Sequence, residues 1–258
     1  MSAPLFSLRD VGVRFGGLRA LNRFSMDVAQ GAIHALIGPN GAGKSTVFNC
    51  VSRFYRPSEG DILFEGESLL KVPAHGIAAR GIARTFQNIE LCRRMTVLEN
   101  VLIGMAPRVP GYFPFAPSRK RTGAERDALA EADALLERTS LMRYRNTPAE
   151  ELDFGHQKML DLARALAAKP KLLLLDEPVS GMNPSETAGF MAKLGEIRAL
   201  GLTVLLVEHD MKMVMGVSDR VVCLSQGRII ASGAPSDIQR DPEVIKAYLG
   251  EKYARAHA

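Results

Sequence analysis

The sequence of 258 residues contains no tryptophan, only three cysteines and no long run of apolar residues. Cys50, Cys92 and Cys223 are an odd number and lack a metal-ligand spacing, so we expect small buried thiols in a reducing cytosol. Apolar runs such as Leu172–Leu175 are much shorter than the roughly 18 residues that a membrane-spanning helix needs. The first residues also show no basic-then-apolar leader. We therefore expect neither a membrane-spanning nor a secreted protein.

The length and composition are typical of a globular protein with one large domain, or with one domain and a modest insert. Hydrophobic residues make up 47% of the chain, which is enough to bury a sizeable core. The 33 lysines and arginines against 28 acidic residues give a net charge of +5, spread along the chain, which is no nucleic-acid signature. One basic run, Arg119, Lys120 and Arg121, is expected to lie in a solvated loop, with contact to a partner or to lipid headgroups as the alternative.

Alternating apolar and polar residues in the first third of the chain predict half-buried strands. The alternation covers residues 5–11 and 24–28 and indicates an antiparallel β region. The apolar run Ile33–Ile37 then leads into a glycine-rich turn, after which residues 44–51 can continue as a helix. A further short strand is expected at 61–64, between two turns.

Helix signals dominate from about residue 96 to residue 147. Thr96 and Glu99 have the spacing of a capping box, which marks the start of a helix. Prolines exclude a continuous helix through residues 108–122, and a helical stripe of alanine and leucine follows from Ala128 to Leu136. We therefore predict a helical lobe of two or more helices around a proline-rich loop.

The last part of the chain alternates predicted helices and strands. A helix is expected at 159–167, and strands are expected at 171–176, 202–207, 221–224 and 228–231. Asn183 can cap a further helix, whose first turn suits Pro184. The alternation predicts an α/β fold with a mainly parallel sheet covered on both faces. We expect one domain, 1–258, with a core formed by 1–95 and 168–258 and a helical subdomain at 96–167.

A glycine-rich segment between the strand at 33–37 and the helix at 44–51 satisfies the pattern G-x-x-x-x-G-K-S. Its glycines allow backbone N–H groups to converge on phosphate oxygens at a helix N-terminus. The Lys44 ammonium can reach the β- and γ-phosphates, and the Ser45 hydroxyl is a suitable ligand for Mg²⁺. The residues expected to bind the nucleotide phosphates are Gly38, Pro39, Asn40, Gly41, Ala42, Gly43, Lys44, Ser45 and Thr46.

Two carboxylates lie at the carboxyl end of the apolar strand expected at 171–176, at the sheet edge where ligands bind in open α/β sheets. Asp176 can hold Mg²⁺ through water, and Glu177 can polarise the water that attacks the phosphate. Without the phosphate loop, such a pair would more often belong to a solvated turn. With the loop present, we interpret it as part of an ATP-hydrolysing site.

Three further side chains are candidates for the same site. His209 follows the strand at 202–207 and should emerge near the γ-phosphate, although a lone histidine is usually a surface or core residue. The neutral amide of Gln87 can contact both Mg²⁺ and water. Phe15 can stack on adenine, although an aromatic residue in a β region belongs to the core by default.

Together these motifs resemble the ATP-binding subunit of ABC transporters over essentially the whole chain. The resemblance rests on Phe15, the phosphate loop, Gln87, Asp176 with Glu177, the segment Ser180 to Asn183, His209, and a signature motif formed by Leu152, Asp153, Phe154, Gly155, His156 and Gln157. Closer matches at 84–89, 95–101, 181–184, 208–211 and 247–250 are similar to the LivG-type ATPase of branched-chain amino acid importers.

The resemblance implies an ABC-type P-loop NTPase with a RecA-like core, using ATP and Mg²⁺. Glu177, His209 and Gln87 would be catalytic, and Ser45, Gln87 and Asp176 would hold the metal. The implied partners are two membrane permease subunits, a second, non-identical ATPase of LivF type and, indirectly, an extracytoplasmic solute-binding protein, with no nucleic acid. The implied location is peripheral, at the cytoplasmic face of the bacterial inner membrane.

Two alternative functions are also consistent with the motifs. The ATPase of a lipopolysaccharide exporter has a similar size and a similar Gln-loop region, but the Asn183-Pro184 turn and the segment 154–156 favour the amino acid importer. A soluble ABC ATPase acting on nucleic acid usually carries long coiled coils, zinc cysteine pairs or two ATPase units, and this chain has none of them. The solute stays unnamed because this subunit would not touch it.

The signature motif departs from the family pattern Leu-Ser-Gly-Gly-Gln. Asp153 stands in place of the serine and Phe154 in place of the first glycine. An ionised carboxylate donates no hydrogen bond and is repelled by phosphate. We therefore expect Asp153 either to turn away or to weaken the ATP site that it completes on a partner chain, which favours a heterodimer.

Overall fold

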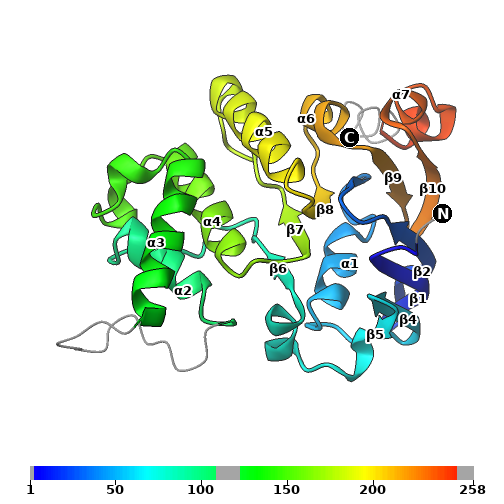
Figure 1. Ribbon diagram of the computed structural model, residues 1–258. Coiled ribbons are helices and arrows are strands. Elements are labelled where there is room, and N and C mark those ends of the chain that lie inside the picture. The colour runs from blue at the N-terminus through cyan, green and yellow to red at the C-terminus, as the bar shows by residue number, and fades with distance from the viewer. Residues whose placement is uncertain (1–2, 109–122, 249–258) are drawn as a thin grey trace.

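The computed structural model describes residues 3–108 and 123–248, which form two β-sheets covered by helices (Figure 1). The smaller sheet is antiparallel, with the strand order β2-β1-β4-β5. Its strands are β1 (Phe6–Phe15), β2 (Leu18–Val28), β4 (Glu59–Phe64) and β5 (Glu67–Ser68). The predicted N-terminal antiparallel region is therefore confirmed.

The larger sheet has the strand order β10-β9-β3-β8-β7-β6. Neighbouring strands from β9 to β6 run parallel, and β10 pairs with β9 in the antiparallel sense. The strands are β3 (Ile33–Ile37), β6 (Ile82–Arg84), β7 (Leu172–Asp176), β8 (Thr203–Val207), β9 (Arg220–Ser225) and β10 (Arg228–Gly233). Every residue of β3, β7 and β8 is buried, which explains their continuous apolar sequences.

Helices cover both faces of this sheet. Helix α1 (Lys44–Val51) packs between the two sheets, and α5 (Pro184–Arg198), α6 (Met211–Val217) and α7 (Pro235–Ile238) cover the other face. Short 3₁₀ helices lie at Leu69–Lys71, Ala74–Gly76, Ala78–Arg80, Met142–Tyr144 and Ala149–Glu151. Within the described residues, no helix combines the length and the apolar character needed to cross a bilayer.

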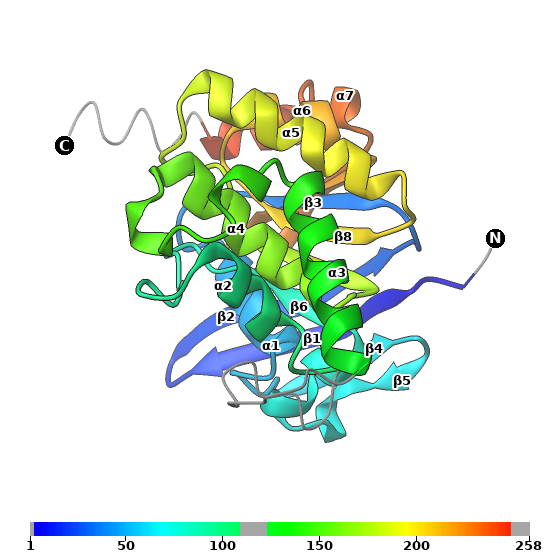
Figure 2. The same cartoon turned by 60° about the vertical axis from the view of Figure 1, so that its left-hand side comes forward.

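Helices α2 (Val97–Gly104), α3 (Gly123–Arg138) and α4 (Phe154–Ala167) form a lobe with a core cluster of its own. They lie to one side of the edge of the larger sheet that ends in β6 (Figures 1 and 2). The capping box at the start of α2 is confirmed. The Thr96 hydroxyl accepts from the Glu99 backbone N–H, and the Glu99 carboxylate accepts from the Thr96 backbone N–H. The predicted Asn183 cap and the Pro184 first turn of α5 are also confirmed.

The structure corrects several expectations. The strand β6 was not predicted, because three residues carry no periodic signal. Helix α4 begins at Phe154 rather than at 159, because Asp153 caps it there. Among the cysteines, Cys50 and Cys223 are buried, and burial raises their pKa to about 12 and about 11, but Cys92 is only partly buried. The basic run 119–121 lies outside the described residues.

Candidate functional site

The phosphate loop connects β3 to α1 as the sequence predicts. Gly43 is the N-cap of α1, has a φ of 112°, and leaves the helix start without a side-chain cap. Gly38 has a φ of 147°, and a Cβ atom there would lie 2.0 Å from the Leu224 carbonyl oxygen. Both positions therefore require glycine. The N–H groups at a helix start without a side-chain cap are a suitable site for an anion.

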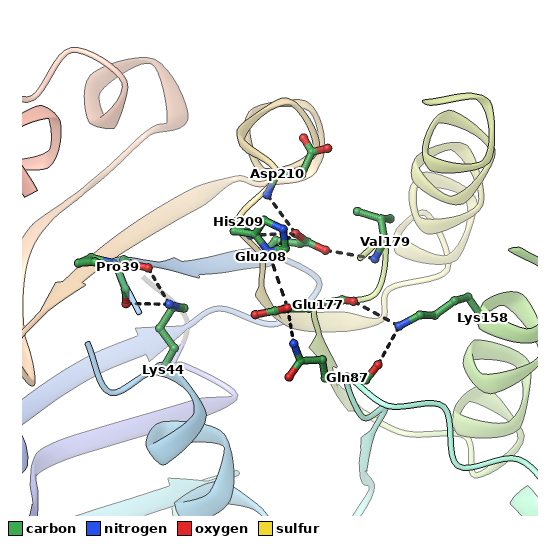
Figure 3. Close-up of polar contacts among 10 residues, drawn as sticks. Pro39, Lys44, Gln87, Lys158, Glu177, Val179, Glu208, His209 and Asp210 are labelled. Atoms are coloured by element: carbon green, nitrogen blue, oxygen red, sulfur yellow. Dashed lines mark hydrogen bonds and ion pairs between the residues drawn. The ribbon is translucent and has the colours of Figure 1, made fainter. Parts of the chain in front are cut away.

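Lys44 is the first residue of α1 and folds back over the loop. Its Nζ donates hydrogen bonds to the carbonyl oxygens of Gly38, at 2.6 Å, and Pro39, at 3.0 Å (Figure 3). Ser45 is exposed and Thr46 partly buried, whereas Val47 begins the buried face of the helix. The loop thus presents a lysine and two hydroxyls at its mouth.

The three predicted catalytic side chains come together at the carboxyl edge of the larger sheet. Gln87 follows β6, Glu177 follows β7 and His209 follows β8, and these strands are parallel neighbours. The Gln87 amide Nε2 donates to Glu177 Oε2 at 2.7 Å, and His209 Nδ1 lies 3.7 Å from the same oxygen (Figure 3). The carboxylate of Glu177 is thereby held by the Gln87 amide and lies within ion-pair distance of His209.

Phe15 lies at the tip of the hairpin that passes beside the phosphate loop. Its strand pairs with β2, and Ala20 of β2 is so close to Gly43 that a Cβ atom on the glycine would lie 2.7 Å from the Ala20 oxygen. The ring is 45% exposed and packs edge to face with Tyr55, with centroids 5.1 Å apart. The default expectation of a core residue is therefore wrong, and the ring is available for stacking on a base.

Arg84, which no sequence motif identified as a site residue, holds Asp176 in a buried ion pair. The guanidinium donates to Asp176 Oδ2 at 2.8 Å, and the two side chains are 10% and 11% exposed. It also donates to the Asn49 and Ser52 side chains at the end of α1. A basic residue at the end of a short apolar segment was the only local signal. Arg84 therefore connects β6, β7 and α1 behind the phosphate loop.

We expect Arg84→Ala to lower the free energy of unfolding by about 3–5 kcal/mol, because it leaves a buried carboxylate without its cation. Urea unfolding of the nucleotide-free chain measures the change. The matched control is Arg9→Ala, which removes an ion pair with Asp27 whose side chains are 46% and 51% exposed and should cost less than about 1 kcal/mol. Equal losses in the two variants would contradict a stabilising role for the buried pair.

Two more buried charged residues support the catalytic cluster. Lys158 of α4 is 5% exposed, and its Nζ donates to the Gln87 carbonyl oxygen at 3.0 Å (Figure 3). Burial lowers the pKa of Lys158. Glu208 is 1% exposed and accepts from the backbone N–H groups of Val179, His209 and Asp210. Lys158 lies four residues before Leu162 and eight before Leu166, on the apolar face of the helix. This spacing is a sequence signal that could have predicted its burial.

The signature residues lie at the start of α4, in the lobe and away from α1 (Figure 1). Asp153 Oδ1 accepts from the His156 backbone N–H at 2.9 Å, and its carboxylate lies 2.7 Å from His156 Nδ1. That backbone hydrogen bond is the largest cause that lowers the pKa of Asp153. Asp153 therefore turns toward its own helix. Leu152 is buried, Phe154 is 44% exposed, and Gly155 lies against Glu186.

The donors predicted for magnesium are a hydroxyl, an amide oxygen and a carboxylate, on Ser45, Gln87 and Asp176. Oxygen atoms of these types are the ligands that Mg²⁺ prefers, so the residues fit the metal. Arg84 holds Oδ2 of Asp176, and the Gln87 amide nitrogen, not its oxygen, contacts Glu177. The described part of the chain holds no cluster of three His, Cys, Asp or Glu side chains suited to a metal.

Comparison with known proteins is consistent with this geometry. The family described as ABC transporter matches residues 21–180, and the family described as branched-chain amino acid ATP-binding cassette transporter matches residues 228–254. The branched-chain amino acid transport ATP-binding protein LivG of Escherichia coli is 44% identical over 97% of this chain and 100% of its own length. The corresponding protein BraF of Pseudomonas aeruginosa is 42% identical with the same coverage.

Solved structures agree with the sequence relatives. An ATP-binding cassette of an ABC transporter in its ADP conformation has a TM-score of 0.85 and 30% identity, and it covers 96% of this chain and 100% of its own. A nucleotide-free cassette has a TM-score of 0.83 and 31% identity, covering 95% of this chain and 98% of its own. The ABC-type P-loop fold expected from the sequence is confirmed.

Proposed function

Since this chain belongs to the ABC transporter family, among ATP-binding subunits of LivG type, we propose that it hydrolyses ATP to power an importer of branched-chain amino acids or related small solutes. The proposal depends mainly on one observation: Gln87 and His209 both contact the Glu177 carboxylate, at the sheet edge where the phosphate loop also lies. The relatives favour this function over a lipopolysaccharide exporter or a nucleic-acid ATPase, so no nucleic-acid partner is invoked.

Each residue predicted for the chain's own ATP site has a role in the proposed reaction. Phe15 stacks on adenine, and the loop residues 38–46 bind the phosphates through backbone N–H groups and Lys44. Glu177 polarises the attacking water, oriented by Gln87 and His209. Ser45, Gln87 and Asp176 would hold Mg²⁺, which neutralises charge on the phosphates.

We propose that the permease subunits bind beside the helical lobe, which we take as residues 96–167. A cavity of about 680 Å³ lies between the segment after Gln87, the start of α4 and the loop at Ser180 and Gly181. It is a suitable place for a helix from one of two permease subunits. The assembly would place the chain at the cytoplasmic face of the bacterial inner membrane, with an extracytoplasmic solute-binding protein acting through the permeases.

Reconstitution tests this function. The chain is co-expressed with two permeases and the second ATPase, purified as one assembly, and placed in vesicles with a binding protein and labelled leucine. We expect ATP-dependent uptake that is lost when this chain is omitted. The amount of chain recovered with membranes is also compared with and without the permeases. Equal recovery with permease-free membranes would indicate attraction to lipid instead of binding to the permeases. Hydrolysis without uptake of any branched-chain or related solute would contradict the importer.

The proposed second ATPase is a non-identical, LivF-type subunit. Asp153 caps its own helix, yet its exposed carboxylate keeps a negative charge at the signature position, close to where the partner's ATP would lie. Asp153→Ser keeps a helix cap, since serine also caps well, and removes the charge. We expect the isolated wild-type chain to hydrolyse ATP far more slowly than the full assembly, and Asp153→Ser to raise the turnover of the isolated chain at least about fivefold.

The control for this comparison is Asp127→Ser, which removes an exposed carboxylate of α3. It should change neither rate. The opposite result is an isolated chain that hydrolyses ATP as fast as the assembly, with Asp153→Ser changing neither rate. That result would show that the two ATP sites are equivalent and would contradict the asymmetric heterodimer.

A further inference from the structure

The helical residues 242–248 near the end of the chain lie against the phosphate loop. Asp241 caps this segment through the N–H groups of Glu243 and Val244, and Val244, 5% exposed, anchors it in the core beside β9. A cavity of about 460 Å³ is lined by loop residues 39–42 on one side and by Glu243, Lys246 and Ala247 on the other. The segment and the loop therefore face each other directly.

Tyr248 of this segment makes a hydrogen bond to the first residue of the loop. The buried backbone N–H of Gly38 donates to the Tyr248 hydroxyl oxygen at 2.8 Å, across 210 positions of sequence. Gly38 stands where the strand ladder ends, since Ile37 is the last residue of β3 paired with β9, at Cys223. A buried N–H without an acceptor is costly, so the hydroxyl replaces a ladder partner at this point.

The same glycine is held from its other side by the lysine of the loop. The Gly38 carbonyl oxygen accepts from Lys44 Nζ at 2.6 Å. Gly38 is thus fixed by Tyr248 through its N–H and by Lys44 through its carbonyl, with a φ that only glycine adopts readily. A loop whose entry is fixed in this way loses less conformational entropy when it binds phosphate.

We propose that Tyr248 is a positioning residue for the phosphate loop, through which the C-terminal segment sets the affinity for ATP. The proposal rests on the proposed function, because it concerns the loop that binds ATP there. The segment lies within residues 228–254, the part matched by the branched-chain transporter family, and Tyr248 gives that part a physical connection to the nucleotide site.

Tyr248→Phe tests the proposal, because it removes one oxygen and keeps the ring that packs against the core. We expect exchange of the Gly38 amide hydrogen, followed by NMR on the nucleotide-free full-length chain, to become at least about tenfold faster. The Kd for ATP should rise about fivefold to tenfold. The kcat of the assembled transporter should stay within about twofold of wild type. The matched control is Ser236→Ala, which removes an exposed hydroxyl from α7 and should change none of the three.

Each outcome is decisive for the positioning role. Faster Gly38 exchange together with weaker ATP binding supports it. Unchanged exchange overturns it, and so does faster exchange with unchanged affinity, because the hydroxyl would then be purely structural. If the wild-type chain binds no ATP, the proposed function fails, and the amide exchange still reports independently on the contact between Tyr248 and Gly38.

Discussion

Glu177→Gln is expected to leave ATP binding intact and to lower hydrolysis by about 10²–10⁴-fold, the usual contribution of a general base. The amide keeps the shape of the side chain but loses the charge that polarises water. In the structure Glu177 Oε2 accepts a hydrogen bond from Gln87 Nε2 at 2.7 Å and lies 3.7 Å from His209 Nδ1. The carboxylate is therefore held in place by the chain's own residues. Phosphate release from the assembled transporter gives the rate, and equilibrium binding of a fluorescent ATP analogue gives the affinity.

The control for this variant is Glu196→Gln, the same change on the exposed face of α5. The Glu196 side chain is 53% exposed and forms an ion pair with Lys193 on the same helix. Its hydrolysis rate should equal that of wild type. Normal turnover by Glu177→Gln would remove Glu177 from catalysis and would leave His209 and Gln87 as the remaining candidates at this edge.

Lys44→Ala is expected to weaken ATP binding by about 10–100-fold, because charge-assisted hydrogen bonds to the phosphates contribute about 1.5–3 kcal/mol. The structure adds a second reason. Lys44 Nζ bridges the carbonyl oxygens of Gly38 and Pro39, so its removal also loosens the loop itself. Titration of the purified chain with a fluorescent ATP analogue measures the loss.

Lys193→Ala is the matched control, since it removes a partly exposed lysine of α5 and breaks its ion pair with Glu196, away from the phosphate loop. It should bind ATP as wild type does. Retained affinity with normal turnover in Lys44→Ala would overturn the assignment of residues 38–46 as the phosphate loop.

Motifs that are contiguous in the chain could be predicted from the sequence. The phosphate loop is specified by its own glycines, because the backbone angles at Gly38 and Gly43 exclude other residues. The apolar runs of β3, β7 and β8 and the caps at Thr96 and Asn183 are equally local. Parallel strands align their carboxyl ends, so the proximity of Glu177 and His209 could be predicted from the two apolar strands that precede them. The position of Gln87 could not, because it follows β6, a strand that the sequence did not predict.

Contacts between distant segments were decided only by the tertiary structure. Arg84 and Asp176 are 92 positions apart, and Gly38 and Tyr248 are 210 apart. Neither pair has a periodic or local signature, since each partner is chosen by which strands and helices pack together. The orientation of the Asp153 side chain was also decided by the structure. The sequence left open whether it turns toward its own helix or toward a phosphate, and the N–H group of His156 at the start of α4 holds it at its own helix. Sequence determined which chemical groups the site contains, and packing determined what holds them in place.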